Sequence, residues 1–147
     1  MRQMHSTLAG VFAIGVFAIN AATLANAQHG SQLVDVGKYE YDTHCAACHG
    51  VDGKGDGPYV QQLRSGIVVP NLTELSKGNN GVFPFARIVE IIDGRAPVKA
   101  HGPTDMPIWG QVYKIESKNL NPSQDSEGFA RVKILFLTEY IYRLQAK

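Results

Sequence analysis

The chain has 147 residues and a formal net charge of +1, with 14 basic and 13 acidic side chains. This balance argues against nucleic acid or an anionic membrane surface as a partner, because both require a concentrated basic face. Only two cysteines are present, too few for a zinc site built on thiolates, and no second pair of ligands stands at finger-like spacing.

The first 27 residues are predicted to be a cleaved export leader. They contain one basic residue, Arg2, then an apolar run from Leu8 to Ile19 and the small-residue stretch Ala25-Asn26-Ala27. An uncleaved membrane anchor is the alternative, but the run is shorter than the ~20 residues that span a bilayer. Residues 28–147 then form one small domain with no net charge and no later apolar segment that could cross a membrane. We therefore expect a periplasmic protein.

The stretch Cys45-Ala46-Ala47-Cys48-His49 carries the clearest chemical pattern in the chain. Two thiols three residues apart, followed at once by a histidine, form the spacing that attaches a haem covalently and ligates its iron. A structural disulfide and a thioredoxin-like redox pair are the alternatives. The redox pair requires a strand–helix–strand pattern that is missing here, and it leaves the histidine unexplained. The motif predicts one haem c, attached through Cys45 and Cys48 and ligated by His49.

The residues before this motif, 33–45, are predicted to form a helix, because their apolar and aromatic positions follow helical spacing. Asp35 places negative charge in the first turn of that helix. Gly37 and Tyr41 share one face, where a glycine lets a second helix approach closely. A glycine on a solvated face is the alternative interpretation. His44 is expected to be exposed.

The residues after the motif are rich in glycine and predict a loop over residues 50–58, followed by a short helix at Tyr59–Leu63. Pro70 lies where an apolar stretch meets a turn. It is either an ordinary turn proline or the residue whose carbonyl accepts the Nδ1–H of the iron-bound imidazole, which fixes the tautomer of the ring. The rigid φ of proline suits the second role.

A further helix is predicted from Phe83 or Pro84 to Asp93, with Gly94 at its end. Met106 follows in a polar loop rich in glycine and proline, and it is the only methionine outside the leader. A lone methionine is normally a core filler. In this loop it is better placed to be the sixth ligand of the iron, and His101 is the rival ligand.

The residues Ile115–Ser126 are polar and without periodicity, and they are predicted to be a surface connection. A last helix is expected to begin near Ser126, which is the candidate N-cap. Its apolar residues form two neighbouring rows, so a broad and mostly buried face is expected; the rows are Phe129, Val132, Phe136 and Tyr140, and Ile134, Leu137, Ile141 and Leu144.

Together these features resemble the class I cytochrome c family over nearly all of residues 33–144. The resemblance implies a small all-α fold of three to five helices wrapped around one covalently bound haem, with the first and last helices crossing. It implies thioether bonds at Cys45 and Cys48 and iron ligation by His49 and Met106. Pro70 and Pro58 both match the proline of the family, and Pro70 is preferred because Leu72 follows it. The segment Tyr113–Asp125 looks like an insertion relative to the family.

With both axial positions filled, the iron has no free position for a substrate, so we expect an electron carrier and not an enzyme. The expected partners are redox proteins such as a dehydrogenase, an oxidase or a respiratory complex, with the protein acting as a monomer or as a subunit. One alternative is a dedicated subunit of a larger complex, with Tyr113–Asp125 as its contact. The other is a haem enzyme or gas sensor with an open iron position.

Overall fold

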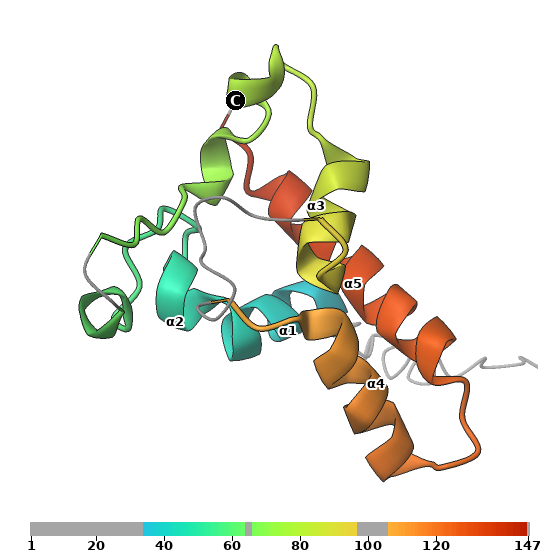
Figure 1. The fold of residues 1–147 in the computed structure, drawn as a ribbon. Coiled ribbons are helices and arrows are strands. Elements are labelled where there is room, and N and C mark those ends of the chain that lie inside the picture. The colour runs from blue at the N-terminus through green and yellow to red at the C-terminus, as the bar shows by residue number, and fades with distance from the viewer. Residues whose placement is uncertain (1–33, 64–65, 97–105, 147) are drawn as a thin grey trace, which may run out of the picture. The chain divides into compact units, whose positions relative to one another are not determined.

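The structure is a computed structural model that describes residues 34–63, 66–96 and 106–146, all within one unit of the chain, Val34–Lys147. The described residues form helices and no strands, which confirms the all-α prediction. The α-helices of the described residues, labelled in Figure 1, are α1 Val36–His44, α2 Ala46–His49, α3 Phe85–Asp93, α4 Trp109–Leu120 and α5 Ser126–Arg143. Three short 3₁₀ segments occur at Val60–Gln62, Leu72–Glu74 and Lys77–Asn79.

The first helix forms where it was predicted, but Asp35 is its N-cap and lies outside its first turn. The carboxylate of Asp35 accepts a hydrogen bond from the backbone N–H of Lys38, which satisfies one of the free donors at the helix start. α1 then ends at His44, and α2 follows as a separate turn that carries the attachment motif. The short helix expected at Tyr59–Leu63 is a single 3₁₀ turn, Val60–Gln62.

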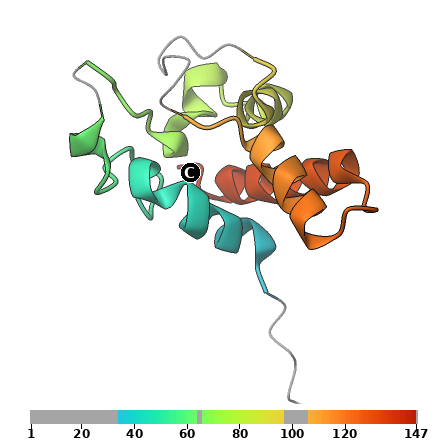
Figure 2. The same ribbon diagram turned by 60° about the horizontal axis from the view of Figure 1, so that its bottom comes forward.

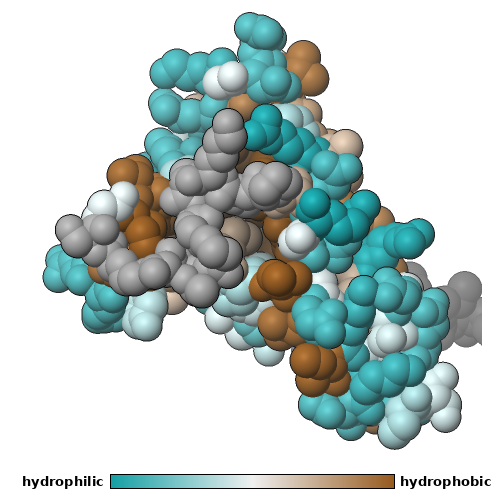
Figure 3. All heavy atoms as spheres, in the orientation of Figure 1, coloured by the Kyte–Doolittle hydropathy of each residue, from teal (hydrophilic) through white to brown (hydrophobic). Residues whose placement is uncertain are grey.

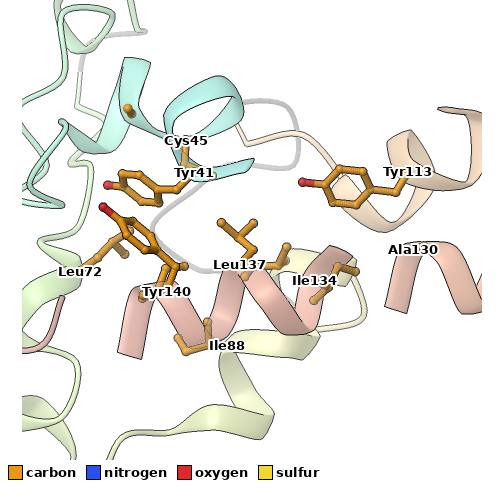
Figure 4. Close-up of a cluster of buried hydrophobic side chains, with 12 residues drawn as sticks. Tyr41, Cys45, Leu72, Ile88, Tyr113, Ala130, Ile134, Leu137 and Tyr140 are labelled. Atoms are coloured by element: carbon orange, nitrogen blue, oxygen red, sulfur yellow. The ribbon is translucent and has the colours of Figure 1, made fainter. Parts of the chain in front are cut away.

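Helix α5 is the central element of the described unit, because it packs against α4, α1 and α3 (Figures 1 and 2). The crossing with α1 depends on Gly37. A Cβ atom on Gly37 would lie 2.3 Å from the carbonyl oxygen of Phe136 and 3.0 Å from the Cβ of Tyr140. The rings of Tyr41 and Tyr140 cover this crossing, with centroids 5.1 Å apart (Figure 4). The close approach predicted from Gly37 and Tyr41 is therefore present.

The prediction of a polar connection over Ile115–Ser126 is wrong, because α4 continues to Leu120 and only a short link precedes α5. The inner face of α4 consists of Gly110, Tyr113 and Ser117, all of them buried. A buried serine and a buried glycine do not register as an apolar stripe, so the helical period is hidden in the sequence.

The apolar face of α5 is narrower than predicted, because Val132 and Phe136 of the first row are exposed. The second row is buried except for Leu144, which is half-buried. The N-cap of α5 is Asp125, whose carboxylate accepts from the N–H groups of residues 127 and 128, in place of the expected Ser126. No helix in the described part of the chain is long and apolar enough to cross a membrane.

Candidate functional site

The attachment motif is held in a fixed backbone arrangement around α2. The N–H groups of Cys48 and His49 both donate to the carbonyl of Cys45, at 3.1 and 2.9 Å, so the five residues form a single helical turn. The hydroxyl of Tyr41 donates to the carbonyl of Gly50 at 2.7 Å, which ties the end of this turn to α1. The turn therefore directs Cys45 and His49 inward, where both are buried.

The imidazole of His49 lies close to the backbone carbonyl of Pro70, the candidate partner chosen from the sequence. Its Nδ1 lies 3.3 Å from the carbonyl oxygen of Pro70. The glycine loop after the motif packs directly on the segment that carries Pro70. A Cβ on Gly55, whose φ is +81°, would lie 2.5 Å from the carbonyl oxygen of Val69, so only glycine allows this packing. With Nδ1 as the donor, Nε2 is left as the nitrogen that binds a metal.

Two cavities of about 90 and 40 Å³ share the same four residues on their walls: Cys45, His49, Met106 and Trp109. Pro70 lines the first cavity and Cys48 lines the second. Leu137, labelled in Figure 4, and Ile88 and Ile92 close the first cavity from α5 and α3. The structure therefore brings together all five residues that the sequence selected.

These walls fit a covalently held haem. The first cavity is lined almost wholly by apolar atoms, as burial of a porphyrin requires. Cys45 and Cys48 supply the two thiols that add to the vinyl groups. One imidazole nitrogen and one thioether sulfur, from His49 and Met106, form an axial ligand pair suited to haem iron. Bound there, the haem would supply a one-electron iron couple.

The two thiols differ chemically from a thioredoxin-like pair. Burial raises the pKa of the Cys45 thiol to about 12, and the charge of Glu40 acts in the same direction. Burial also raises the pKa of Cys48. A redox-active cysteine pair requires a lowered pKa and a stable thiolate. The environment therefore disfavours disulfide exchange as the chemistry of this motif.

The sequence predictions for two other histidines, His101 and His44, have different outcomes. His101, the rival ligand, lies outside the described residues. His44 is not exposed as predicted: its ring packs against Trp109 with centroids 4.8 Å apart and against the edge of Tyr113 at 5.9 Å. It also lines the second cavity. The prediction was wrong because α4, whose Trp109 and Tyr113 cover His44, was not predicted as a helix.

A buried polar cluster lies beside this site, where α1, α4 and α5 meet. Glu40 is only 1% exposed, and one of its oxygens forms an ion pair with Lys133 of α5. Burial opposes the charge of Lys133, but the hydrogen bond and charge of Glu40, together with those of Glu116, outweigh it, so the pKa of Lys133 is raised. Burial, and secondarily the charge of Glu40, raises the pKa of Tyr113 well above its ordinary value. We name Glu40, Tyr113, Ser117 and Lys133 the polar junction.

A separate groove of about 500 Å³ lies between α3, α4 and α5, and none of the predicted site residues lines it. Its walls carry five charged side chains: Asp93, Arg95, Lys114, Glu127 and Arg131. Two ion pairs, Arg95–Asp93 and Lys114–Glu127, neutralise four of them. The predicted site residues therefore lie on the two smaller cavities. The described residues contain no group of three or more His, Cys, Asp or Glu that could hold a metal ion by themselves.

The sequence model of the family described as Cytochrome c matches residues 34–124. The chain belongs to the cytochrome c family. Neither a curated protein nor a solved structure matches it significantly. As a cytochrome c, it is a haem c protein of electron transfer, and Cys45 and Cys48 are consistent with the covalent attachment found in this family. The match ends just before α5, which packs on α1 and α4 in the structure.

Sequence reasoning missed Trp109 and Glu40 as residues near the site of this cytochrome. Trp109 follows Met106 by three residues and begins α4, so its place on both cavity walls follows from the helix that was not predicted. Glu40 precedes His44 by one helical turn. That spacing placed the two on one face of α1, but only the packing of α4 and α5 buries them.

Proposed function

We propose that this cytochrome c is exported through the leader of residues 1–27 and carries one electron at a time between redox proteins of the periplasm. One haem would be held by thioether bonds to Cys45 and Cys48, and His49 and Met106 would ligate its iron. The observation that carries the proposal is that His49 and Met106 line the same two cavities as the first cysteine.

The ligand pair supports electron transfer over chemistry on a substrate. With His49 and Met106 both bound to the iron, no position would remain for a substrate. A methionine thioether favours ferrous iron and raises the reduction potential, and the apolar walls around Leu137 act in the same direction. The contact between His49 and Pro70 would hold the imidazole in the tautomer that leaves Nε2 for the iron.

The decisive experiment compares absorption spectra of the oxidised protein and of Met106→Ala. We expect the wild type to show the long-wavelength band of sulfur bound to ferric iron and the variant to lack it. Persistence of the band in the variant would exclude Met106 as the ligand. A His101→Gln variant serves as the control, because it removes the rival ligand and should leave the band unchanged.

A haem enzyme or gas sensor requires an open iron position. Carbon monoxide would bind quickly to the resting ferrous protein in that case, and slowly or not at all if Met106 holds the sixth position. A redox titration completes the test, because a protein without a reversible one-electron haem couple is not an electron carrier.

A second candidate function, as a fixed subunit of a periplasmic dehydrogenase or respiratory complex, is favoured by the outer face of α4. Ile108, Val112 and Ile115 are exposed there at helical spacing, next to Met106, and Figure 3 shows apolar residues gathered over this helix. Isolation from native cells distinguishes the two functions. A partner at fixed stoichiometry, lost in Ile115→Lys, would identify a subunit, whereas a monomer that exchanges electrons with several proteins would identify a carrier.

A further inference from the structure

The polar junction contains buried atoms that the electron-transfer site does not explain. Tyr113 and Ser117 are fully buried and face the same way, one turn apart on α4. The hydroxyl of Ser117 has no hydrogen-bond partner within the described ranges, and the hydroxyl of Tyr113 and the Oε2 of Glu40 lie close to each other without a well-formed hydrogen bond. Buried polar groups are nearly always paired, so these atoms between α1 and α4 indicate a role for the polar junction other than packing.

The junction connects solvent with the cavity walls. On the outer side, Lys133 pairs with Glu40 and lies 3.6 Å from Glu116. On the inner side, the Nε2 of His44 lies 3.5 Å from the Oε2 of Glu40. The side chain of His44 is 28% exposed, so protons from water can reach it. His44 also lines the second cavity together with Cys45 and Cys48.

Resting on the electron-transfer function proposed above, we propose that the Glu40–His44 pair binds one proton when the haem iron is reduced and releases it when the iron is oxidised. On reduction, one electron arrives from the redox partner and one proton moves from water to the pair. On oxidation, the electron passes to a redox partner and the proton returns to water. Ferric iron carries one more positive charge than ferrous iron, and charges repel more strongly inside a protein than in water.

Glu40 is the positioning residue of this pair. The charged and titratable groups that face it are His44 and Cys45 from its own helix and the turn that follows, Tyr113 and Glu116 from α4, and Lys133 from α5. Lys133 occupies one oxygen of Glu40, and the other oxygen is left for the imidazole of His44. Because Glu40 and His44 are coupled, the proton belongs to the pair and not to either side chain alone.

The test measures the midpoint potential of the haem-loaded protein between about pH 5 and 9, where imidazole side chains change charge. We expect the wild-type potential to fall as pH rises, corresponding to a proton affinity at least threefold higher in the reduced protein. Glu40→Gln and His44→Phe should both abolish this dependence. NMR titration of the His44 ring in each oxidation state reads the proton directly and does not depend on electron-transfer activity.

Matched variants show whether the pH dependence belongs to the Glu40–His44 pair. Glu139→Gln makes the same change at an exposed carboxylate of α5, and it should retain the pH dependence. His101→Gln should retain it as well; loss of the dependence there and not in His44→Phe would overturn the proposal. If Glu40→Gln does not fold, His44→Phe decides the question, because it keeps a ring against Trp109.

Two results separate failure of this proposal from failure of the proposed function. A reversible one-electron couple whose potential does not change with pH would overturn the proton coupling and leave the carrier intact. The absence of any such couple would overturn the carrier function and the proton coupling with it. If Glu40→Gln lowers stability but leaves the pH dependence unchanged, Glu40 only holds the helices together, and the proposal is wrong.

Discussion

The first cavity beside Cys45 and the polar junction around Glu40 both lie against α4 and α5, but apolar side chains enclose one and polar side chains form the other. The first cavity is enclosed by aliphatic and aromatic side chains, and His49 on its wall is matched by the carbonyl of Pro70. The junction instead buries a carboxylate and two hydroxyls, with one lysine as the counter-ion of the carboxylate.

The difference shows that the same helices are stabilised by two kinds of interaction. Around Leu137, stability comes from apolar area removed from water, which is not directional and adapts to the shape of a cofactor. Around Glu40, stability depends on the pairing of charges, because an unpaired polar atom costs about 1–3 kcal/mol when it is buried. Substitutions in the two regions should therefore fail for different reasons.

The largest effect is expected for Lys133→Met, which removes the counter-ion of a buried carboxylate. Breaking a buried pair from one side costs about 3–5 kcal/mol, because the remaining charge is left without compensation. Urea denaturation of the haem-loaded protein measures this loss. The control is Lys38→Met, whose pair with Asp42 is exposed and should contribute far less to stability.

A double variant, Glu40→Gln with Lys133→Met, sharpens the same comparison. With both charges removed, most of the loss should be recovered, because no uncompensated charge stays buried. If the double variant is as unstable as Lys133→Met alone, the junction is held by packing of the lysine stem and not by the ion pair.

In the apolar region, Leu137→Ala should lower the free energy of unfolding by about 2–5 kcal/mol, because it enlarges a cavity beneath a fully buried side chain. The matched control lies two residues earlier on the same helix. Leu135 is 41% exposed, and Leu135→Ala should change stability by less than about 0.5 kcal/mol. Equal effects of the two variants would contradict the assigned inner face of α5.

The contact between α1 and α5 gives a third, intermediate effect. Gly37→Ala should cost about 1–3 kcal/mol, because its Cβ would meet backbone of α5 that cannot move as a side chain can. Gly78→Ala is the control, since nothing lies within 4 Å of a Cβ added there. Thermal unfolding of both variants decides whether this crossing limits stability.

The smallest effect is expected at the exposed start of α1, where Asp35→Ala should cost about 1 kcal/mol at neutral pH. The hydrogen bond from Arg143, and then that from the N–H of Lys38, lowers the pKa of Asp35 below its ordinary value of 3.8. A lowered pKa means that this stabilisation is present above about pH 4 and is lost as the pH falls further. Unfolding curves of wild type and variant should therefore converge in acid.

The elements that could be predicted are those whose pattern is local. Cys45, Cys48 and His49 are adjacent in the chain, so their geometry follows from one helical turn. The crossing at Gly37 and the C-cap at Gly94 also follow from single residues, a missing side chain in one case and a left-handed φ of 83° in the other. These signals require no knowledge of distant parts of the chain.

The elements that could not be predicted are those whose pattern is set by distant partners. Ser117 reads as a loop residue, yet it is fully buried on α4. His44 reads as an exposed residue and Glu40 was given no role, yet α4 packs on His44 and Lys133 of α5 pairs with Glu40. Val132 and Phe136 read as core, but α5 turns them toward solvent. Tertiary packing overrides single-residue preference at each of these positions.

By itself, the sequence determined the attachment motif, the all-α class and the residues expected around the cofactor, because covalent spacing and helical period are properties of short segments. Only the tertiary structure decided that Met106 lies on the same cavity walls as His49, and that a carboxylate is buried beside them. These depend on how helices far apart in the chain pack together, and burial is a property of that packing and not of any one residue.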